Sequence, residues 1–320
     1  MTVALVATGG TIASTPTAGA DAEPALRGAD LIDAVPGLGE LADLAVREFS
    51  SVPSPHFTVE DMHELAGVVA DLDAREDVTG VVVTQGTDVL EETAYFLDLR
   101  YDGDTPVAVT GAMRNPSLPS ADGPANLLAA VRAVLSPEAA DLGVLVAFND
   151  RLHAAREVTK AHTTNPDAFR TSEFGPLGAV EEDRVVWYRS PTRTDPTFDV
   201  ETDRLTADVH AVTATVEMPA EQVAVAAEGD GLCLAATGAG HVPPNVVPAL
   251  EELVAADVPL VVTSRCPEGR LARNTYGFLG SEATLRELDA YYSDVNLQKT
   301  RIKAIVALAA GRLDDAFERP

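Results

Sequence analysis

Two threonines in this chain stand where an apolar run ends in a glycine turn, and an aspartate and a lysine could make their hydroxyls reactive. The threonines are Thr11 and Thr87, and Asp88 follows the second of them. A hydroxyl attacks a carbonyl carbon only when a nearby base takes its proton, and a desolvated lysine held by a carboxylate can serve as that base. Lys160 is one of three lysines among 23 basic residues, and arginine could not replace it because arginine keeps its proton. This set indicates acyl-transfer chemistry.

The same turns also have simpler interpretations. Residues 8–11 could cradle a phosphate on backbone amides, or could form a purely structural turn. The sequence here lacks both the third glycine of a dinucleotide fingerprint and the Gly-Lys-Ser/Thr ending of a mononucleotide loop. Thr87 and Asp88 could cap a helix, since both residue types accept hydrogen bonds from first-turn amides. The presence of Lys160 favours catalysis over capping.

The elements expected to position these residues alternate between strands and helices over residues 1–190. Strands are predicted at residues 3–7, 81–84, 107–111 and 143–148, and helices at 30–46, 59–73, 90–99 and 123–135. Continuous apolar strands separated by helices predict an α/β domain with a mainly parallel sheet, flanked by helices. Ligands of such sheets bind beyond the carboxyl ends of the strands, so Thr11, Thr87, the 111–114 turn and the 149–160 segment are expected to share one crevice.

A second, smaller α/β domain is predicted over residues 209–320, after a polar linker at 191–208 that is rich in proline, threonine and aspartate. Apolar runs at 212–216, 232–236 and 260–263 predict strands. Helical patterns cover 246–256, 282–291 and 299–310. The carboxyl-terminal domain is therefore expected to hold about four parallel strands.

Charge limits the classes of partner. Fifty acidic against 23 basic residues give a formal net charge of −27, which repels nucleic acid and anionic membranes. No apolar run approaches the roughly 20 residues of a membrane-spanning helix, and the amino terminus lacks a secretory signal, so a cytoplasmic protein is expected. An acidic surface of this kind is compatible with a salty cytoplasm or with a GC-rich genome.

Cysteine and histidine usage predicts neither a disulfide nor a metal site. Cys233 and Cys266 each close an apolar run and are expected to be buried thiols. The histidines lack metal-ligand spacing, so we expect no metal and no cofactor.

The motifs together resemble bacterial-type L-asparaginases, in that family's order and spacing and over nearly the whole chain. Several separate motifs that agree in order are far more specific than one glycine pattern. The matching segments are 8–13, 85–88, 91–97, 111–114, 120–127, 149–150, 158–160, 276–277 and 296–299.

The resemblance implies roles for single residues. Thr11 is similar to the family's loop nucleophile. Thr87, Asp88 and Lys160 resemble its second triad of threonine, aspartate and lysine.

Substrate binding is implied at further positions. Ser54 is expected to hold the α-carboxylate, and Asp88 the α-ammonium. The backbone at Ala112 would receive the side-chain amide, and the turns at Gly10 and Gly86 would complete the binding site and its oxyanion-binding amides.

The resemblance implies hydrolysis of L-asparagine to L-aspartate and ammonia through an acyl-enzyme, in a homodimer or homotetramer with active sites at a subunit interface. The chain departs from the family because residues 14–30 contain no tyrosine, and because Pro55 and His241 replace a usual glutamine and asparagine. The acidic residue that a neighbouring subunit often lends is either Glu268 or absent. Three alternatives stay open. A glutaminase-asparaginase would act on both amides, the amidase component of a tRNA-dependent amidotransferase is disfavoured by the negative charge, and a non-catalytic amino-acid-binding protein would not need Lys160.

Overall fold

The chain forms two compact units, residues 1–197 and 198–320. The computed structural model describes residues 1–16, 22–24, 27–192, 194–200 and 205–319. The predicted linker at 191–208 spans the boundary between the units, and its residues 193 and 201–204 lie outside the described part of the chain. Its role as a linker stays a prediction.

An eight-stranded sheet forms the centre of the larger unit, in the order β12-β11-β8-β7-β6-β5-β1-β4. The strands from β4 to β7 in that order pair in parallel, and β8, β11 and β12 continue the sheet as antiparallel strands. The α/β class and the mainly parallel sheet are therefore confirmed. The strands are β1 Thr2–Gly9, β4 Asp43–Val52, β5 Val78–Thr84, β6 Val107–Thr110, β7 Leu145–Phe148, β8 Arg151–Ala154, β11 Gly178–Glu181 and β12 Arg184–Trp187.

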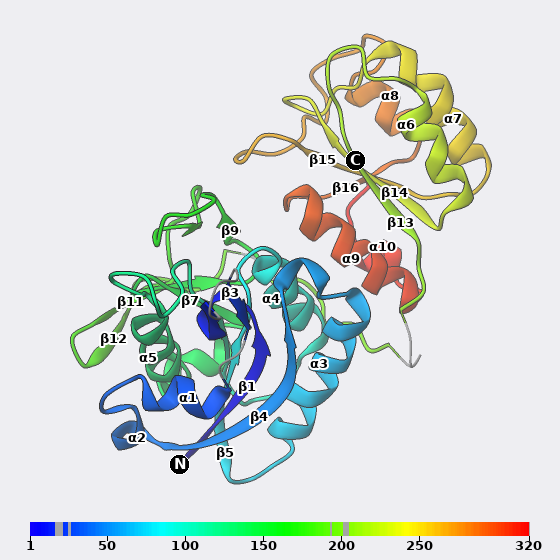
Figure 1. Cartoon of the computed structure of the whole chain (residues 1–320). Helices are drawn as coiled ribbons and strands as arrows, with labels where there is room; N and C mark the ends of the chain where they lie inside the picture. The colour runs from blue at the N-terminus through cyan, green and yellow to red at the C-terminus, as the bar shows by residue number, and fades with distance from the viewer. Residues whose placement is uncertain (17–21, 25–26, 193, 201–204, 320) are drawn as a thin grey trace. The chain divides into compact units, whose positions relative to one another are not determined.

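Helices cover both faces of this sheet, so its central strands are buried on both sides. Figure 1 shows α1 and α5 on one face and α3 and α4 on the other. Leu5, Val82 and Leu127 belong to one apolar cluster, in which α5 packs on the first of these faces. The helices are α1 Gly28–Asp33, α2 Leu38–Leu41, α3 Val59–Asp73, α4 Leu90–Arg100 and α5 Gly123–Val134, with short 3-10 turns η1 Thr11–Ala13, η2 Ser54–His56 and η3 Pro137–Asp141.

Two small antiparallel ribbons extend from the larger unit: β2 Ser14–Pro16 with β3 Ala22–Pro24, and β9 Thr159–Lys160 with β10 Phe169–Arg170. The second ribbon carries the candidate catalytic lysine.

The smaller unit has a parallel sheet in the order β13-β14-β15-β16, which confirms the four-stranded prediction. Its core lies between this sheet and the helices, around Leu234, Val262 and Leu250. The elements are β13 Val209–Thr213, β14 Gly231–Ala236, β15 Leu260–Ser264, β16 Tyr291–Tyr292, α6 Glu221–Ala224, α7 Val247–Ala255, α8 Glu282–Glu287, α9 Leu297–Ala309 and α10 Leu313–Ala316, with η4 Val225–Glu228 and η5 Pro244–Val246.

Some predicted elements were wrong. The helix expected at 30–46 consists of α1 and α2 and then gives way to β4. The helix expected at 282–291 ends at Glu287, and Tyr291 already belongs to β16. Cys266 is exposed, although Cys233 is buried as expected, and both thiols are free.

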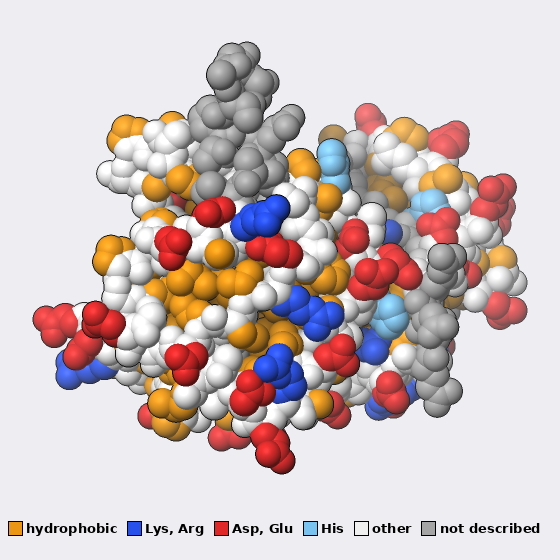
Figure 2. Space-filling model, turned by 60° about the horizontal axis from the view of Figure 1, so that its bottom comes forward, with side chains coloured by type: hydrophobic (Ala, Val, Ile, Leu, Met, Phe, Trp, Pro, Cys, Tyr) orange, Lys and Arg blue, Asp and Glu red, His pale blue; other side chains and the backbone are white. Residues whose placement is uncertain are grey.

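Acidic side chains are distributed over the surface. Figure 2 shows them scattered over the visible face, where they outnumber Lys and Arg. A net charge of −27 destabilises the compact state by self-repulsion, and salt screens that repulsion. Raising NaCl from 0.1 M to 1 M shortens the Debye length from about 10 Å to about 3 Å. We expect the melting temperature to rise over this range, as measured by differential scanning calorimetry; a constant or falling melting temperature would contradict this expectation.

Candidate active site

The two glycine turns that present Thr11 and Thr87 lie against each other. They follow β1 and β5, which are neighbouring parallel strands. A Cβ atom built on Gly10 would come closer than 3.0 Å to the backbone of Gly86, and one built on Gly86 would lie 2.7 Å from the Ser54 Cβ. Only glycine allows the backbones of the two turns to come this close. Their contact brings the starts of both turns together.

The side chains of Thr87, Asp88 and Lys160 are in direct contact. Lys160 Nζ donates to Thr87 Oγ1 at 2.9 Å and to Asp88 Oδ1 at 2.6 Å. Thr87 is buried, the Lys160 side chain is 13% exposed, and the Asp88 side chain is 57% exposed. The structure thus brings the Lys160 amine to a hydroxyl and a carboxylate that lie more than 70 positions earlier in the sequence.

Ser54 joins the same cluster from the edge strand β4. Its hydroxyl donates to Asp88 Oδ2 at 3.2 Å and accepts from the Asp88 backbone N–H at 3.3 Å. Ser54 is buried and begins η2, just after β4 ends at Val52. The first four residues of β4, 43–46, fell within the helix predicted at 30–46, yet the serine that follows the strand lies beside Asp88.

The turn that carries Ala112 follows β6 and is held by side chains from the start of α5. Asp122 accepts from the backbone N–H groups of Met113, at 3.0 Å, and Arg114, at 2.8 Å. Asn126 Nδ2 donates to the Gly111 carbonyl at 2.9 Å. A Cβ on Gly111 would lie 3.4 Å from Thr87 Cγ2, so this turn packs beside Thr87. Neither Asp122 nor Asn126 was assigned a role from sequence, although both lie in the motif at 120–127.

Thr11 stands apart from the hydrogen-bonded cluster. It begins η1 and is partly exposed, while the Gly10 carbonyl before it accepts from Ser14 Oγ at 2.8 Å. Within the described residues, no hydrogen bond joins the Thr11 hydroxyl to Thr87, Asp88 or Lys160. The structure therefore places the Thr11 turn next to Gly86 without linking its side chain to the amine.

The structure does not support helix capping by Thr87 and Asp88 or phosphate binding by the 8–11 turn. The N-cap of α4 is Val89, with no side-chain cap, so neither Thr87 nor Asp88 caps the helix. After β1, residues 11–13 form a 3-10 turn and the chain then enters β2, so no α-helix N-terminus follows to bind a phosphate.

A cavity of about 310 Å³ opens at the Lys160 end of this cluster, lined by Asp88 and residues 160–163. The hydrogen bond from Lys160 holds the pKa of the Asp88 carboxyl below its ordinary value of 3.8. Partial burial acts in the opposite direction but is outweighed. Asp88 is therefore a carboxylate at neutral pH. In the described part of the chain, no group of three or more His, Cys, Asp or Glu side chains is arranged to hold a metal ion.

Because the pKa of Asp88 is lowered in the folded protein, the contribution of this carboxylate to stability should depend on pH. A carboxyl whose folded pKa lies below its unfolded value contributes stability above the unfolded value and loses it as the pH falls through the folded value. The stability gap between wild type and Asp88→Asn should therefore be the same at pH 7 and pH 5 and shrink below the ordinary value of 3.8. Urea unfolding at each pH measures the gap; a gap that closes between pH 7 and pH 5 would contradict the assignment.

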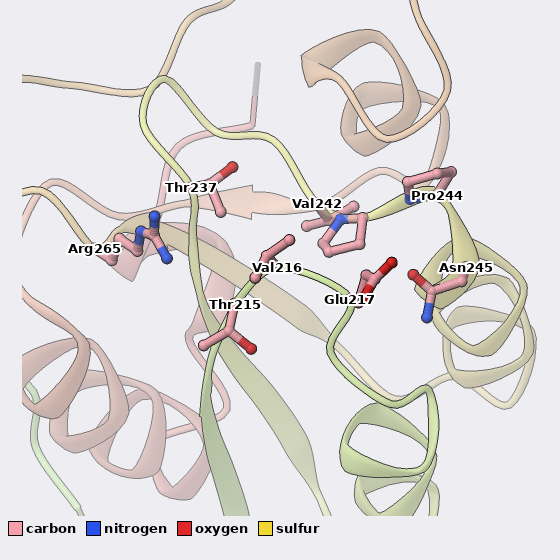
Figure 3. Close-up of a pocket in the computed structure, with 9 residues that line it drawn as sticks. Thr215, Val216, Glu217, Thr237, Val242, Pro244, Asn245 and Arg265 are labelled. Atoms are coloured by element: carbon pink, nitrogen blue, oxygen red, sulfur yellow. The ribbon is translucent and has the colours of Figure 1, made fainter.

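A larger cavity, of about 750 Å³, lies in the smaller unit by itself, beyond the carboxyl ends of β13, β14 and β15. Figure 3 shows Arg265 on one side of it and Glu217 and Asn245 on the other. Its polar side chains hold the surrounding loops: Arg265 donates to the Ala214 carbonyl at 2.9 Å and Asn245 to the Met218 carbonyl at 2.8 Å. These bonds give the cavity walls a structural role.

The fold is that of an α/β protein with a larger and a smaller unit, in which a threonine, an aspartate and a lysine are in contact beyond the carboxyl end of β5. Residues 2–193 match the family model described as "Asparaginase, N-terminal", and residues 208–319 match that of the "Glutaminase/Asparaginase C-terminal domain". The chain therefore belongs to the asparaginase family of amidohydrolases, which act on amino-acid amides.

Individual relatives agree with this assignment. The probable L-asparaginase of Deinococcus radiodurans is 38% identical over 99% of this chain and 96% of its own length. The glutaminase-asparaginase of Pseudomonas fluorescens biotype A is 36% identical over 96% of this chain and 86% of its own length. A solved structure, the probable cytoplasmic L-asparaginase of Campylobacter jejuni, superposes with a TM-score of 0.83 at 34% identity, covering 96% of this chain and 94% of its own.

Over the described residues, no helix has the length and apolar character needed to cross a membrane.

Proposed function

We propose that this protein is an L-asparaginase that hydrolyses L-asparagine to L-aspartate and ammonia through an ester on a threonine. The observation that carries the proposal is the hydrogen bond of 2.9 Å from Lys160 Nζ to Thr87 Oγ1, with the same amine paired to Asp88 at 2.6 Å. Binding alone needs no amine beside a hydroxyl, whereas amide hydrolysis needs a group that takes and returns protons.

The first half of the reaction forms the acyl-enzyme. Thr11 Oγ1 attacks the side-chain amide carbon, a C–O bond forms, and backbone amides of the Gly10 and Gly86 turns stabilise the oxyanion. The amide nitrogen of the tetrahedral intermediate acts as the base that takes the proton of Thr11, the C–N bond breaks, and ammonia departs. The packing of the Gly10 turn against Gly86 supports this role, because it places Thr11 on a turn adjacent to Thr87.

The second half hydrolyses the ester. Water held at Thr87 attacks the ester carbon and passes a proton through the Thr87 hydroxyl to the neutral amine of Lys160, whose own proton has left to solvent by way of the exposed Asp88 carboxylate. The proton then returns to Thr11 as the C–O bond breaks and aspartate is released. Asp88 serves twice in this scheme, since it pairs with Lys160 and, beside Ser54, binds the substrate's α-ammonium while Ser54 holds the α-carboxylate.

Assembly and location are part of the proposal. Among the described residues, Asp88 and residues 160–163 line the cavity at Lys160, which is compatible with a neighbouring subunit completing it in a homodimer or homotetramer. Light scattering with activity measured across a dilution series tests this. We also propose a cytoplasmic enzyme, as the name of the Campylobacter jejuni protein states for that relative.

Ammonia release from L-asparagine, L-glutamine and D-asparagine, compared at steady state, tests the proposed function. L-asparagine should give the highest kcat/KM; equal use of L-glutamine would favour a glutaminase-asparaginase, and no release from any substrate would refute hydrolysis.

Thr11→Ala and Thr87→Ala separate formation of the acyl-enzyme from its hydrolysis. Mass spectrometry of quenched enzyme should find an aspartyl ester in Thr87→Ala and none in Thr11→Ala.

A further inference from the structure

The strand that carries Lys160 has little backbone pairing of its own. β9 comprises two residues, Thr159 and Lys160, which pair with the two residues of β10. On one side the ribbon is anchored by Phe169 of β10, whose ring lies 4.7 Å from that of Phe148 at the end of β7. A two-residue ribbon is only marginally stable alone, so the position of the lysine depends on what holds its other edge.

Glu91 holds that other edge. Ala161 N–H donates to the Ala168 carbonyl at 2.7 Å, and successive residues of a strand point their N–H groups to opposite edges, so the Lys160 N–H faces away from β10. It donates there to Glu91 Oε1 at 3.2 Å, and the Thr159 hydroxyl donates to the same oxygen at 3.2 Å. Glu91 is 5% exposed, so this carboxylate is committed to the interior.

Glu91 belongs to the helix that also fixes the other half of the cluster. It lies in the first turn of α4, which begins at Leu90, two residues after Asp88. A carboxylate is favoured at this end of a helix by the backbone dipole. The same helix, α4, therefore fixes the position of Thr87 and Asp88, which come shortly before it in the chain. It also fixes the position of Lys160, whose backbone N–H is held by the Glu91 carboxylate.

We propose that Glu91 is a positioning residue that fixes Lys160 Nζ within hydrogen-bond reach of Thr87. The inference rests on the proposed function, in which Lys160 is the base. Loss of the acceptor removes the two hydrogen bonds that tie this edge of β9 to α4, and a shift of about 1 Å in a catalytic group is enough to cost about 100-fold in rate.

The test compares three variants in the full-length protein. Glu91→Leu removes the acceptor and should lower kcat for L-asparagine about 100-fold with KM changed less than about threefold. Glu91→Gln keeps a side-chain oxygen at the same place and should restore kcat to within about threefold of wild type. The control is Glu60→Leu, which removes a carboxylate from the first turn of another helix, α3, and should leave kcat unchanged.

The outcomes are separable from failure of the proposed function. Retained turnover in Lys160→Met would refute the base itself. If Lys160→Met is inactive and a folded Glu91→Leu keeps wild-type kcat, only the positioning role is overturned, and a rise in KM without loss of kcat overturns it too. Should Glu91→Leu fail to fold by circular dichroism, Thr159→Val decides: a severalfold lower kcat supports the proposal and an unchanged kcat overturns it.

Discussion

Replacing Lys160 with methionine should lower kcat for L-asparagine by at least about 1,000-fold while the protein stays folded. Methionine nearly matches lysine in length but its thioether cannot take a proton, so neither Thr87 nor a bound water can be activated through it. The side chain is 13% exposed and its cationic end pairs with the exposed Asp88, so the fold loses little. Ammonia release at saturating substrate measures kcat, and circular dichroism with thermal unfolding verifies the fold.

Lys160→Arg distinguishes proton transfer from simple charge. Arginine keeps a cation beside Asp88 but does not release its proton at accessible pH. We expect a loss of kcat similar to that of the methionine variant, with binding of L-aspartate better preserved because the positive charge remains. Substantial turnover in Lys160→Arg would show that the site needs the charge and not a base. Turnover in both variants would remove Lys160 from the mechanism.

The central fold was predictable because its signals are local. The predicted helix at 59–73 has the same bounds as α3, whose buried residues Leu65, Val68, Val69 and Leu72 follow helical spacing. The strands β1 and β5 are continuous apolar runs because helices cover both faces of the sheet. Patterns of this kind follow from burial alone.

The edge strand β4 was not predictable in the same way. It lies at the end of the sheet, and none of its ten residues is fully buried, so it lacks an apolar run. The helical spacing of Leu31, Val35 and Leu38 before it is real, but those residues belong to α1, α2 and the turn between them. Extending that pattern beyond Ala42 produced the error.

The path to Lys160 was missed for a different reason. β7 turns back into the antiparallel β8 through Asn149 and Asp150, both with positive φ, at 51° and 58°. Asn and Asp at consecutive positions are a recognisable signal for a tight hairpin turn. The interpretation of 149–160 as one segment after a parallel strand overlooked it.

The site was predictable as a set of residues and not as a geometry. Motif order was sufficient to pick out Thr87, Asp88 and Lys160, which the structure brings into contact. The supporting contacts of Glu91 and Asp122 depend on tertiary packing between segments that no spacing rule connects. Charged residues near a motif give no signal of which backbone amides they will hold.

Gly10→Ala should abolish turnover and lower the free energy of unfolding by about 3 kcal/mol or more. Gly10 has φ 85° and ψ −173°, a region that is essentially restricted to glycine, and side chains placed there cost about 1–3 kcal/mol. The added methyl would also overlap the backbone of Gly86, which no rotamer change can relieve. Because the two turns must separate to accept it, Thr11 should move away from Thr87, and kcat should fall at least about 100-fold.

Gly67→Ala is the matched control for this prediction. Gly67 lies inside α3, and a Cβ there meets nothing within 4 Å. Alanine in a helix interior should stabilise the protein by about 0.5–1 kcal/mol and leave kcat unchanged. Urea unfolding and ammonia release on both variants measure the contrast. Normal turnover in Gly10→Ala would mean that the contact between the two turns is not needed to align the threonines, and the proposed division of the reaction between Thr11 and Thr87 would lose its structural support.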